Sequence, residues 1–210
     1  MLAKDLIVLT ACKNAQFAVK GILSRGASLG IRQIEVEFIV HPQKDPGCVK
    51  SAHDLLRAQS KRFDYALVVF DLEGCGVYDK TPDELAEEVR GALQNSGWAN
   101  RAEVVVISPE LEIWVWSDSP EVQNVLGWAG RIPTLRQWLV DMGFLGTLEQ
   151  QKPSRPKEAV EASLMEAAIS RSSALYLELA EKVSLKRCTD PAFVKLKRTL
   201  ENWFKAPPAA

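Results

Sequence analysis

The sequence predicts an α/β protein with a small, mostly parallel four-strand sheet, helices on both faces of the sheet, and a helical C-terminal portion. Two observations lead to this prediction. Four short apolar runs alternate with helical segments in the first half of the chain, which is the pattern of β-α-β units. After Ser117, helical periodicity replaces the strand-like runs. We expect residues 1–117 to form the α/β core, residues 118–205 to form helices packed on it, and residues 206–210 to be a flexible tail.

The four predicted strands differ in pattern. Leu6–Thr10 and Tyr65–Phe70 are continuous apolar runs, as expected for strands that are buried on both faces. Ile34–Val40 alternates apolar residues with glutamates, which is typical of a half-buried strand, and we place it toward a sheet edge. Val104–Ile107 is the fourth strand.

Helices are predicted from apolar periodicity and from capping residues. The clearest cap is Thr81, with Pro82 at the first helical position and Glu84 as its capping-box partner. Gly97 is expected to end that helix. The other predicted helices are Ala15–Leu23, Cys48–Ala58, a short one from Ser119, Leu135–Met142, Pro156–Ile169, Ser173–Val183 and one that Asp190 opens. The segment "ELEIWVW" fits either a strand or a first helical turn, and Trp114 and Trp116 within it are expected in the core or a subunit interface.

Composition limits the function classes. The 210 residues carry a net charge of −1, so the chain as a whole is not an obvious nucleic-acid binder. The four cysteines are dispersed and there are two histidines, so no zinc motif can be assembled. Dispersed cysteines are typical of reduced thiols, and the apolar runs are too short for a signal peptide or a membrane span. We expect a cytoplasmic protein without a membrane partner.

The C-terminal ends of parallel strands meet at one edge of the sheet, where ligands bind. The residues expected there are Thr10, Cys12, Lys13 and Asn14; His41, Lys44 and Asp45; Asp71 and Glu73; and Ser108, Glu110 and Glu112. Carboxylates held close together raise one another's pKa unless a cation neutralises them. Hard oxygen ligands suit Mg²⁺, with Mn²⁺ as the alternative. The other interpretation is that these acids are spread out and solvated.

Basic residues near that edge are candidates for binding phosphate. Lys13 and Lys44 follow the first two strands, and Arg155 and Lys157 lie in "KPSRPKE". Cations beside a metal site would neutralise the remaining charge of a phosphate. A solvated helix start explains Arg155 and Lys157 equally well. Neither common Gly-rich phosphate loop is present, which argues against a small-nucleotide-binding domain.

The pattern resembles the Toprim-like domains of anti-phage defence proteins. The chain is most similar to a small subunit of the bacterial methylation-associated defence systems, the fourth named component. The segments that carry this resemblance are "HPQKDPGC", "VVFDLEGCG", "ISPELEIWVWSDSPEV", "GWAGR", "KPSRPKEA", "RSSALY" and "SLKRCTDPAF". The resemblance implies a role beside other subunits of the defence system, with DNA as a candidate partner. It also implies that Asp71 and Glu73 form the catalytic, metal-binding acid pair, with Glu112 as a further ligand or base.

One departure from the Toprim pattern leaves two hypotheses open. Toprim enzymes place a glutamate just after the first strand, whereas this chain has "TACKNAQ" there, with no carboxylate. The first hypothesis is an Mg²⁺-dependent nuclease or nuclease-like subunit in which Glu112 substitutes. The second is a non-catalytic scaffold or sensor with a degenerate site, which contacts partner proteins through its Trp-rich helical portion.

Overall fold

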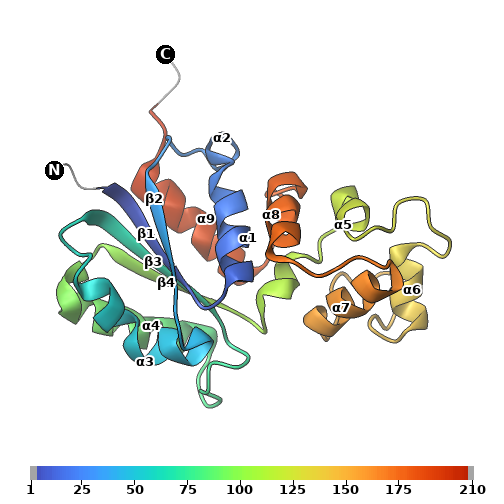
Figure 1. Ribbon diagram of the computed structural model, residues 1–210, viewed down its shortest axis with the longest axis horizontal. Coiled ribbons are helices and arrows are strands. Elements are labelled where there is room, and N and C mark those ends of the chain that lie inside the picture. Colours follow the sequence, from blue (N-terminus) through green and yellow to red (C-terminus); the bar gives the residue numbers. More distant parts are fainter. Residues whose placement is uncertain (1–3, 208–210) are drawn as a thin grey trace.

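The computed structural model describes residues 4–207, and its centre is a sheet of four parallel strands (Figure 1). The strands are β1 (Lys4–Thr10), β2 (Val36–Val40), β3 (Phe63–Asp71) and β4 (Ala102–Ile107). Their order is β2-β1-β3-β4, so β3 is an interior strand and β2 is an edge strand that is half-buried throughout. The predicted fold class and the edge position of the second strand are both confirmed.

The register aligns the C-terminal ends of the strands. Thr10 at the end of β1 pairs with Val40 of β2 and Val69 of β3, and Asp71 at the end of β3 pairs with Ile107 of β4. Loops that leave these ends therefore begin side by side, and polar residues in them can share one site.

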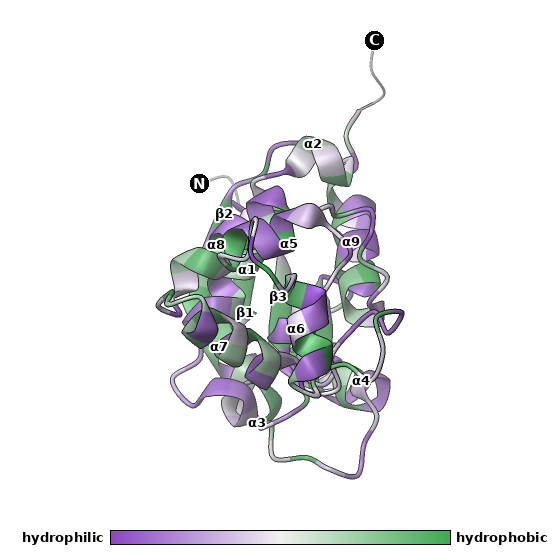
Figure 2. Ribbon diagram, turned by 90° about the vertical axis from the view of Figure 1, so that its right-hand side faces the viewer, coloured by the Kyte–Doolittle hydropathy of each residue, from purple (hydrophilic) through white to green (hydrophobic). Residues whose placement is uncertain are grey.

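Helices cover both faces of the sheet, as predicted. One face packs against α3 (Lys44–Arg57) and α4 (Pro82–Leu93), and the other packs against α1 (Lys13–Leu23) and α9 (Pro191–Phe204) (Figure 1). Alternate residues of the central strands feed the two cores, because successive side chains of a strand point to opposite faces. In Figure 2, α9 carries hydrophilic and hydrophobic stretches side by side, as expected of a helix that packs one face on the core.

The caps predicted for α4 are present. The Thr81 side chain accepts a hydrogen bond from the Glu84 amide, and the Glu84 carboxylate accepts one from the Thr81 amide. The helix α4 passes into a π-helical turn (Gln94–Trp98), in which Gly97 leaves helical geometry with a left-handed φ of 95°. The Trp98 indole is buried there and donates to the Leu56 carbonyl oxygen at 3.1 Å, which ties the turn to the end of α3.

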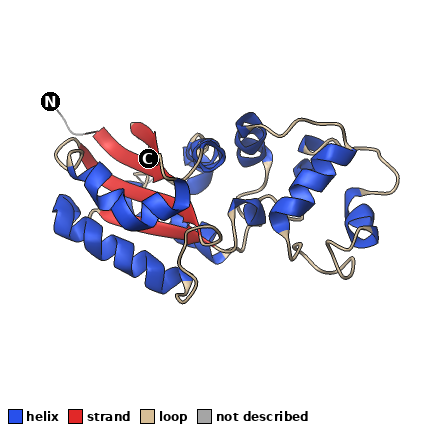
Figure 3. Cartoon of the chain, turned by 60° about the horizontal axis from the view of Figure 1, so that its bottom comes forward, coloured by secondary structure: helices blue, strands red, loops and turns tan. Residues whose placement is uncertain are grey.

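The C-terminal portion is helical, and the strands are confined to the other part of the described chain (Figure 3). After β4 come a 3₁₀ turn (Leu111–Trp114) and then the helices of this portion, α5 (Pro120–Val125), α6 (Leu135–Asp141), α7 (Pro156–Glu166), α8 (Ser173–Lys182) and α9. The short α2 (Gly26–Leu29) belongs to the α/β core, between α1 and β2. The helix α8 packs closely on α1 at Gly21, where a Cβ would lie 2.7 Å from the Cβ of Ala180. Only glycine allows this approach.

The last helix returns to the sheet and completes the core. The Trp203 ring stacks on Tyr65 of β3 with ring centroids 4.5 Å apart, and Phe204 meets the same ring edge-on. Beyond α9, the Ala206 amide donates to the Gly30 carbonyl oxygen at 3.0 Å, so the predicted tail is tied down at its first residue. Residues 208–210 of that predicted tail lie outside the described residues. Between residues 4 and 207, no helix has both the length and the apolar character needed to cross a bilayer.

Candidate active site

Acidic side chains from three loops meet at the C-terminal edge of the sheet. Asp71 ends β3, Glu110 and Glu112 follow β4, and Asp45 lies in the first turn of α3 after β2. The charges of Asp45, Glu110 and Glu112 all raise the pKa of Asp71, which requires these carboxylates to lie close to it. Asp45, Glu110 and Glu112 are therefore neighbours of Asp71 at this edge.

Asp71 is the least satisfied of these acids. Its Oδ1 atom is buried and has no hydrogen-bond partner within the described part of the chain, although the residue as a whole is partly exposed. Burial, followed by the neighbouring carboxylates, holds its pKa well above the usual range, and the Leu111 amide offsets only part of this rise. A buried oxygen without a donor destabilises a fold, and it is the atom that a bound cation would satisfy.

Asp45 is positioned by its loop and by the Asp71 backbone. Its Oδ1 accepts a hydrogen bond from the Asp71 amide at 2.9 Å. The preceding Lys44 has a φ of 53°, a left-handed conformation that is unfavourable for a residue with a side chain. The buried His41 ring stabilises this turn, because its Nδ1 accepts from the Gln43 amide at 3.1 Å and its Nε2 lies 3.1 Å from the Ser51 hydroxyl.

Glu73 is exposed on the loop that follows Asp71. Its amide donates to the Pro109 carbonyl oxygen at 2.9 Å, which joins the loop after β3 to the loop after β4. The charge of Glu73 raises the pKa of Glu110, so the two side chains are neighbours. Gly74 and Gly76 both have a φ of +84°, and a residue with a Cβ would be strained at either position. The sequence therefore favours this tight loop, which keeps Glu73 beside the edge.

Glu110 faces a single cation. Its Oε1 accepts a hydrogen bond from the Lys157 amide at 3.1 Å, and its Oε2 lies 3.8 Å from Lys157 Nζ. Burial first, then the charges of Glu112 and Glu73, raise the pKa of Glu110 to about 7, against the opposing charge of Lys157. A carboxyl with this pKa can both accept and release a proton near neutral pH.

Glu112 is buried and fully engaged on one oxygen. Its Oε1 accepts hydrogen bonds from Arg171 Nη2 and from the Tyr176 hydroxyl, each at 2.5 Å. Both partners come from the helical portion, Arg171 from the segment before α8 and Tyr176 from α8 itself. This network anchors the helical portion to the sheet edge. It also differs from the ligand role predicted for Glu112, because the shared oxygen already has two strong donors.

The four predicted phosphate-binding cations separate into two groups. The charges of Lys157 and Lys44 both lower the pKa of Asp45 against the rise that burial causes, so these two lysines lie near the acids. Lys13 is exposed at the first residue of α1, whose N-cap is the Cys12 side chain. Arg155 packs within the helical portion, with its guanidinium 5.3 Å from the centre of the Phe144 ring.

Two cysteines and two tryptophans near this edge are buried or half-buried and pack in the protein interior. Burial raises the pKa of both Cys12 and Cys48, which keeps these thiols protonated. Trp116 is buried, and its indole donates to the Pro156 carbonyl oxygen at 2.9 Å. The half-buried Trp114 indole donates to Asp190 Oδ1 at 2.9 Å. Both tryptophans are core residues, in line with the first of the two positions expected for them.

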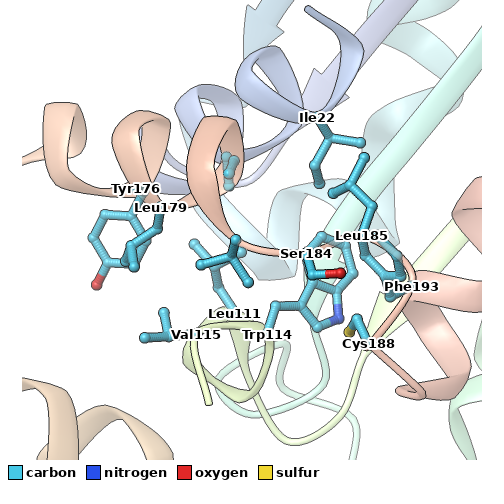
Figure 4. Close-up of a pocket in the computed structure, with 13 residues that line it drawn as sticks. Ile22, Leu111, Trp114, Val115, Tyr176, Leu179, Ser184, Leu185, Cys188 and Phe193 are labelled. Atoms are coloured by element: carbon cyan, nitrogen blue, oxygen red, sulfur yellow. The ribbon is translucent and has the colours of Figure 1, made fainter. Parts of the chain in front are cut away.

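Two residues of the edge were not singled out by the sequence analysis. Arg171 and Tyr176 lie 59 and 64 positions after Glu112, and no local spacing links them to it. The sequence offered one indication of such partners: Glu112 lies in an apolar segment, and a carboxylate that becomes buried requires a cation or hydrogen-bond donors. A separate cavity between α1, α8 and the 3₁₀ turn is mostly apolar (Figure 4), with Leu111 and Trp114 among its walls and Ser184 and Cys188 as polar groups.

The candidate metal ligands do not form a closed cage. Within residues 4–207, no three His, Cys, Asp or Glu side chains are already placed to hold a metal ion together. An open arrangement of one or two carboxylates is compatible with Mg²⁺, which keeps several water ligands and often binds substrate phosphate.

No protein-family model, curated protein or solved structure matches the chain, so its function is inferred from the geometry of this edge.

Proposed function

We propose that the acidic sheet edge binds a divalent cation and acts there on the phosphodiester backbone of a nucleic acid. In this proposal the chain is a nuclease-like subunit of a bacterial anti-phage defence system. The observation that carries the catalytic part is the buried, unpartnered Oδ1 of Asp71, surrounded by other carboxylates. The defence context depends only on the resemblance of the sequence motifs.

The residues present fit a Mg²⁺ or Mn²⁺ ion. Asp71 supplies the orphaned oxygen, Asp45 is the first of the carboxylates whose charges raise its pKa, and Glu73 lies on the exposed loop that follows Asp71. Glu112 acts as a fixed negative charge behind them, because Arg171 and Tyr176 hold its Oε1. When bound, the cation supplies Lewis-acid activation of a phosphoryl oxygen and neutralises charge that develops on it.

The protein residues have distinct roles in this chemistry. Glu110, with a pKa of about 7, can accept a proton from an attacking water molecule at neutral pH. Lys157 is 3.8 Å from that carboxylate and can orient a phosphate group beside it. Lys44 lies near Asp45 and supplies a second positive charge. The protein thereby offers two lysines beside the acid cluster to bind the charged oxygens of a phosphate.

The decisive experiment is a cleavage assay with single-stranded and double-stranded DNA and RNA in Mg²⁺ or Mn²⁺. Asp71→Asn should abolish cleavage, with a loss of at least about 100-fold, because it removes the charged ligand and keeps the shape. The matched control is Asp64→Asn, which changes an exposed aspartate near the other end of the same strand and should cleave normally. Equal activity of the two variants would contradict the proposed site.

The second candidate function is a non-catalytic scaffold, and one observation favours it. Ile132 and Met165 in the helical portion are 97% and 80% exposed, and Arg131 donates two hydrogen bonds to the Glu166 carbonyl oxygen, which brings their neighbouring segments together. Exposed apolar side chains of this size are typical of protein contacts. Under this hypothesis Ile132→Asp abolishes phage protection and co-purification of the other subunits, whereas Asp71→Asn changes neither.

A further inference from the structure

A cleft in the helical portion is lined by three cationic side chains and is separate from the acidic edge. It has a volume of about 200 Å³, and its walls include Arg136 of α6, Lys152, Arg187, Asp118, Thr189 and Trp116. A larger groove of about 480 Å³ continues from it along α5 and α6 and shares Arg136 and Asp118 with it. The larger groove therefore leads into the cleft, and three of the residues that line the cleft carry a positive charge.

The wall that carries Lys152 is already ordered without a ligand. The Arg136 guanidinium donates to the carbonyl oxygens of Leu148 and Gln150, at 2.5 Å each for its shortest contacts. The Gln150 side chain accepts from the Gly146 amide at 2.7 Å and donates to the Lys152 carbonyl oxygen at 2.8 Å. These hydrogen bonds tie the loop between Gly146 and Lys152 to itself and to α6. A preformed site binds its ligand without the cost of ordering the loop.

The nearby carboxylates neutralise these cations only in part. Lys152 Nζ lies 3.6 Å from Asp190 Oδ2, beyond hydrogen-bonding distance, while the other oxygen of Asp190 accepts from the Trp114 indole and from two amides that begin α9. Arg187 Nη1 lies 3.7 Å from Asp118 Oδ1, and both side chains are more than half exposed. The exposed Arg187–Asp118 pair is weak at this separation, and Arg187 Nη1 makes only a long hydrogen bond of 3.4 Å to the Asp118 carbonyl oxygen. Lys152 makes no hydrogen bond to the buried Asp190, so the Nζ donors of Lys152 can turn to an anion.

The geometry points to this cleft as a binding site for a phosphate group, held between Lys152 and Arg187 with Arg136 adding positive charge from the wall. A guanidinium and an ammonium that line one cleft suit the tetrahedral oxygens of phosphate. The phosphate can belong to a nucleic-acid strand or to a free small molecule, since both present the same oxyanion. This site does not depend on a cation at the acidic edge.

The test measures binding in EDTA, so that the acidic edge cannot contribute a metal ion. The probes are a fluorescein-labelled 12-nucleotide single-stranded DNA, ADP and inorganic phosphate, followed by anisotropy for the DNA and by calorimetry for the others. Lys152→Gln combined with Arg187→Gln should weaken binding by about tenfold. For the DNA it should also reduce the slope of log K against log salt by about 0.7, as expected for the loss of one phosphate contact to a single strand.

Two matched variants make the test specific. Lys186→Gln removes the same charge from the exposed residue beside Arg187, which does not line the cleft, and should leave binding unchanged within twofold. Asp118→Asn removes the carboxylate that competes for Arg187 and should tighten binding about two- to threefold, as expected for loss of a weak exposed pair.

The outcomes separate the two sources of phosphate. Weakened binding of DNA alone assigns the cleft to a nucleic-acid backbone, and weakened binding of ADP or inorganic phosphate as well assigns it to a small phosphorylated ligand. The proposal is overturned if none of the three probes binds the wild type, or if Lys186→Gln weakens binding as much as the cleft variants do. Failure to cleave nucleic acid at the acidic edge would contradict the proposed function, but it would not change the binding that is measured at the cleft in EDTA.

Discussion

Asp71 and Glu112 are acids at the same edge of the sheet with buried carboxylate oxygens, yet the fold treats them in opposite ways. Glu112 Oε1 receives two short hydrogen bonds, from Arg171 and Tyr176, whereas Asp71 Oδ1 receives none. A buried carboxylate that is paired and hydrogen-bonded is compatible with a stable fold, and one that is left without a donor is not. Under the proposed function, Glu112 serves the structure and Asp71 is the residue that receives the cation.

The largest expected effect concerns the satisfied acid. Arg171→Met removes the cation that pairs with Glu112 and leaves a buried charge, which should lower the free energy of unfolding by about 3–5 kcal/mol. Urea denaturation measures the change, with Arg198→Met, an exposed arginine on α9, as the control. Adding Glu112→Gln to Arg171→Met should recover part of the loss. If Arg171→Met is no more destabilising than the control, Glu112 is not held as described.

The next effect is the pH dependence that Glu110 contributes to stability. Its pKa is about 7 in the folded protein, above its usual value of 4.5, so the folded state holds the proton more tightly than the unfolded state. Stability should therefore fall as pH rises from about 5 to 8, by on the order of 2 kcal/mol, and the loss is complete above the folded pKa. The groups facing Glu110 are Glu112, Glu73 and Lys157.

Glu110→Gln isolates this contribution. The variant should show a flatter profile of the free energy of unfolding against pH between 5 and 8, measured by urea denaturation in EDTA. Glu158→Gln, an exposed glutamate in the first turn of α7, is the control and should keep the wild-type slope. An unchanged slope in Glu110→Gln would contradict the position of Glu110, whereas the wild-type slope alone also contains the opposite contribution of the buried His41, whose pKa burial lowers.

A smaller effect of opposite sign is expected at Asp71. Without divalent cations, Asp71→Asn should stabilise the protein by about 1 kcal/mol, because it removes a charge from a site where burial and three carboxylates disfavour it. Thermal unfolding in EDTA measures the change against Asp64→Asn. Asp71 would resemble Glu112 after all if its replacement destabilised the protein by more than about 1 kcal/mol, as loss of a structural hydrogen bond does.

The sequence predicted the sheet better than the site. Strands such as Tyr65–Phe70 and the capped helix at Thr81 follow from local patterns, and the structure contains both. The acids at the edge were also predictable, because strand ends determine which loops meet. The pairing of Glu112 with Arg171 and Tyr176 was not, since it joins residues about sixty positions apart through the packing of α8.

The separate roles of Glu110 and Glu112 depend on one local conformation. "ELEIWVW" could be a strand or a helical start, and on a strand both glutamates would point the same way. In the structure Glu110 is extended and precedes a 3₁₀ turn, so the two side chains diverge, one toward Lys157 and the other toward Arg171. Propensity alone could not choose between these conformations, because burial in the core of the helical portion selects the turn.

The most direct test of the contrast between Asp71 and Glu112 is the change in melting temperature that Mg²⁺ causes in the wild type, Asp71→Asn and Asp64→Asn. At a Mg²⁺ concentration about 100 times the dissociation constant, the wild type and Asp64→Asn should melt roughly 5–10 °C higher than in EDTA, and Asp71→Asn should not shift. A wild type that does not respond to Mg²⁺ or Mn²⁺, or an Asp71→Asn variant that responds as the wild type does, would contradict the assignment of Asp71 to a bound cation.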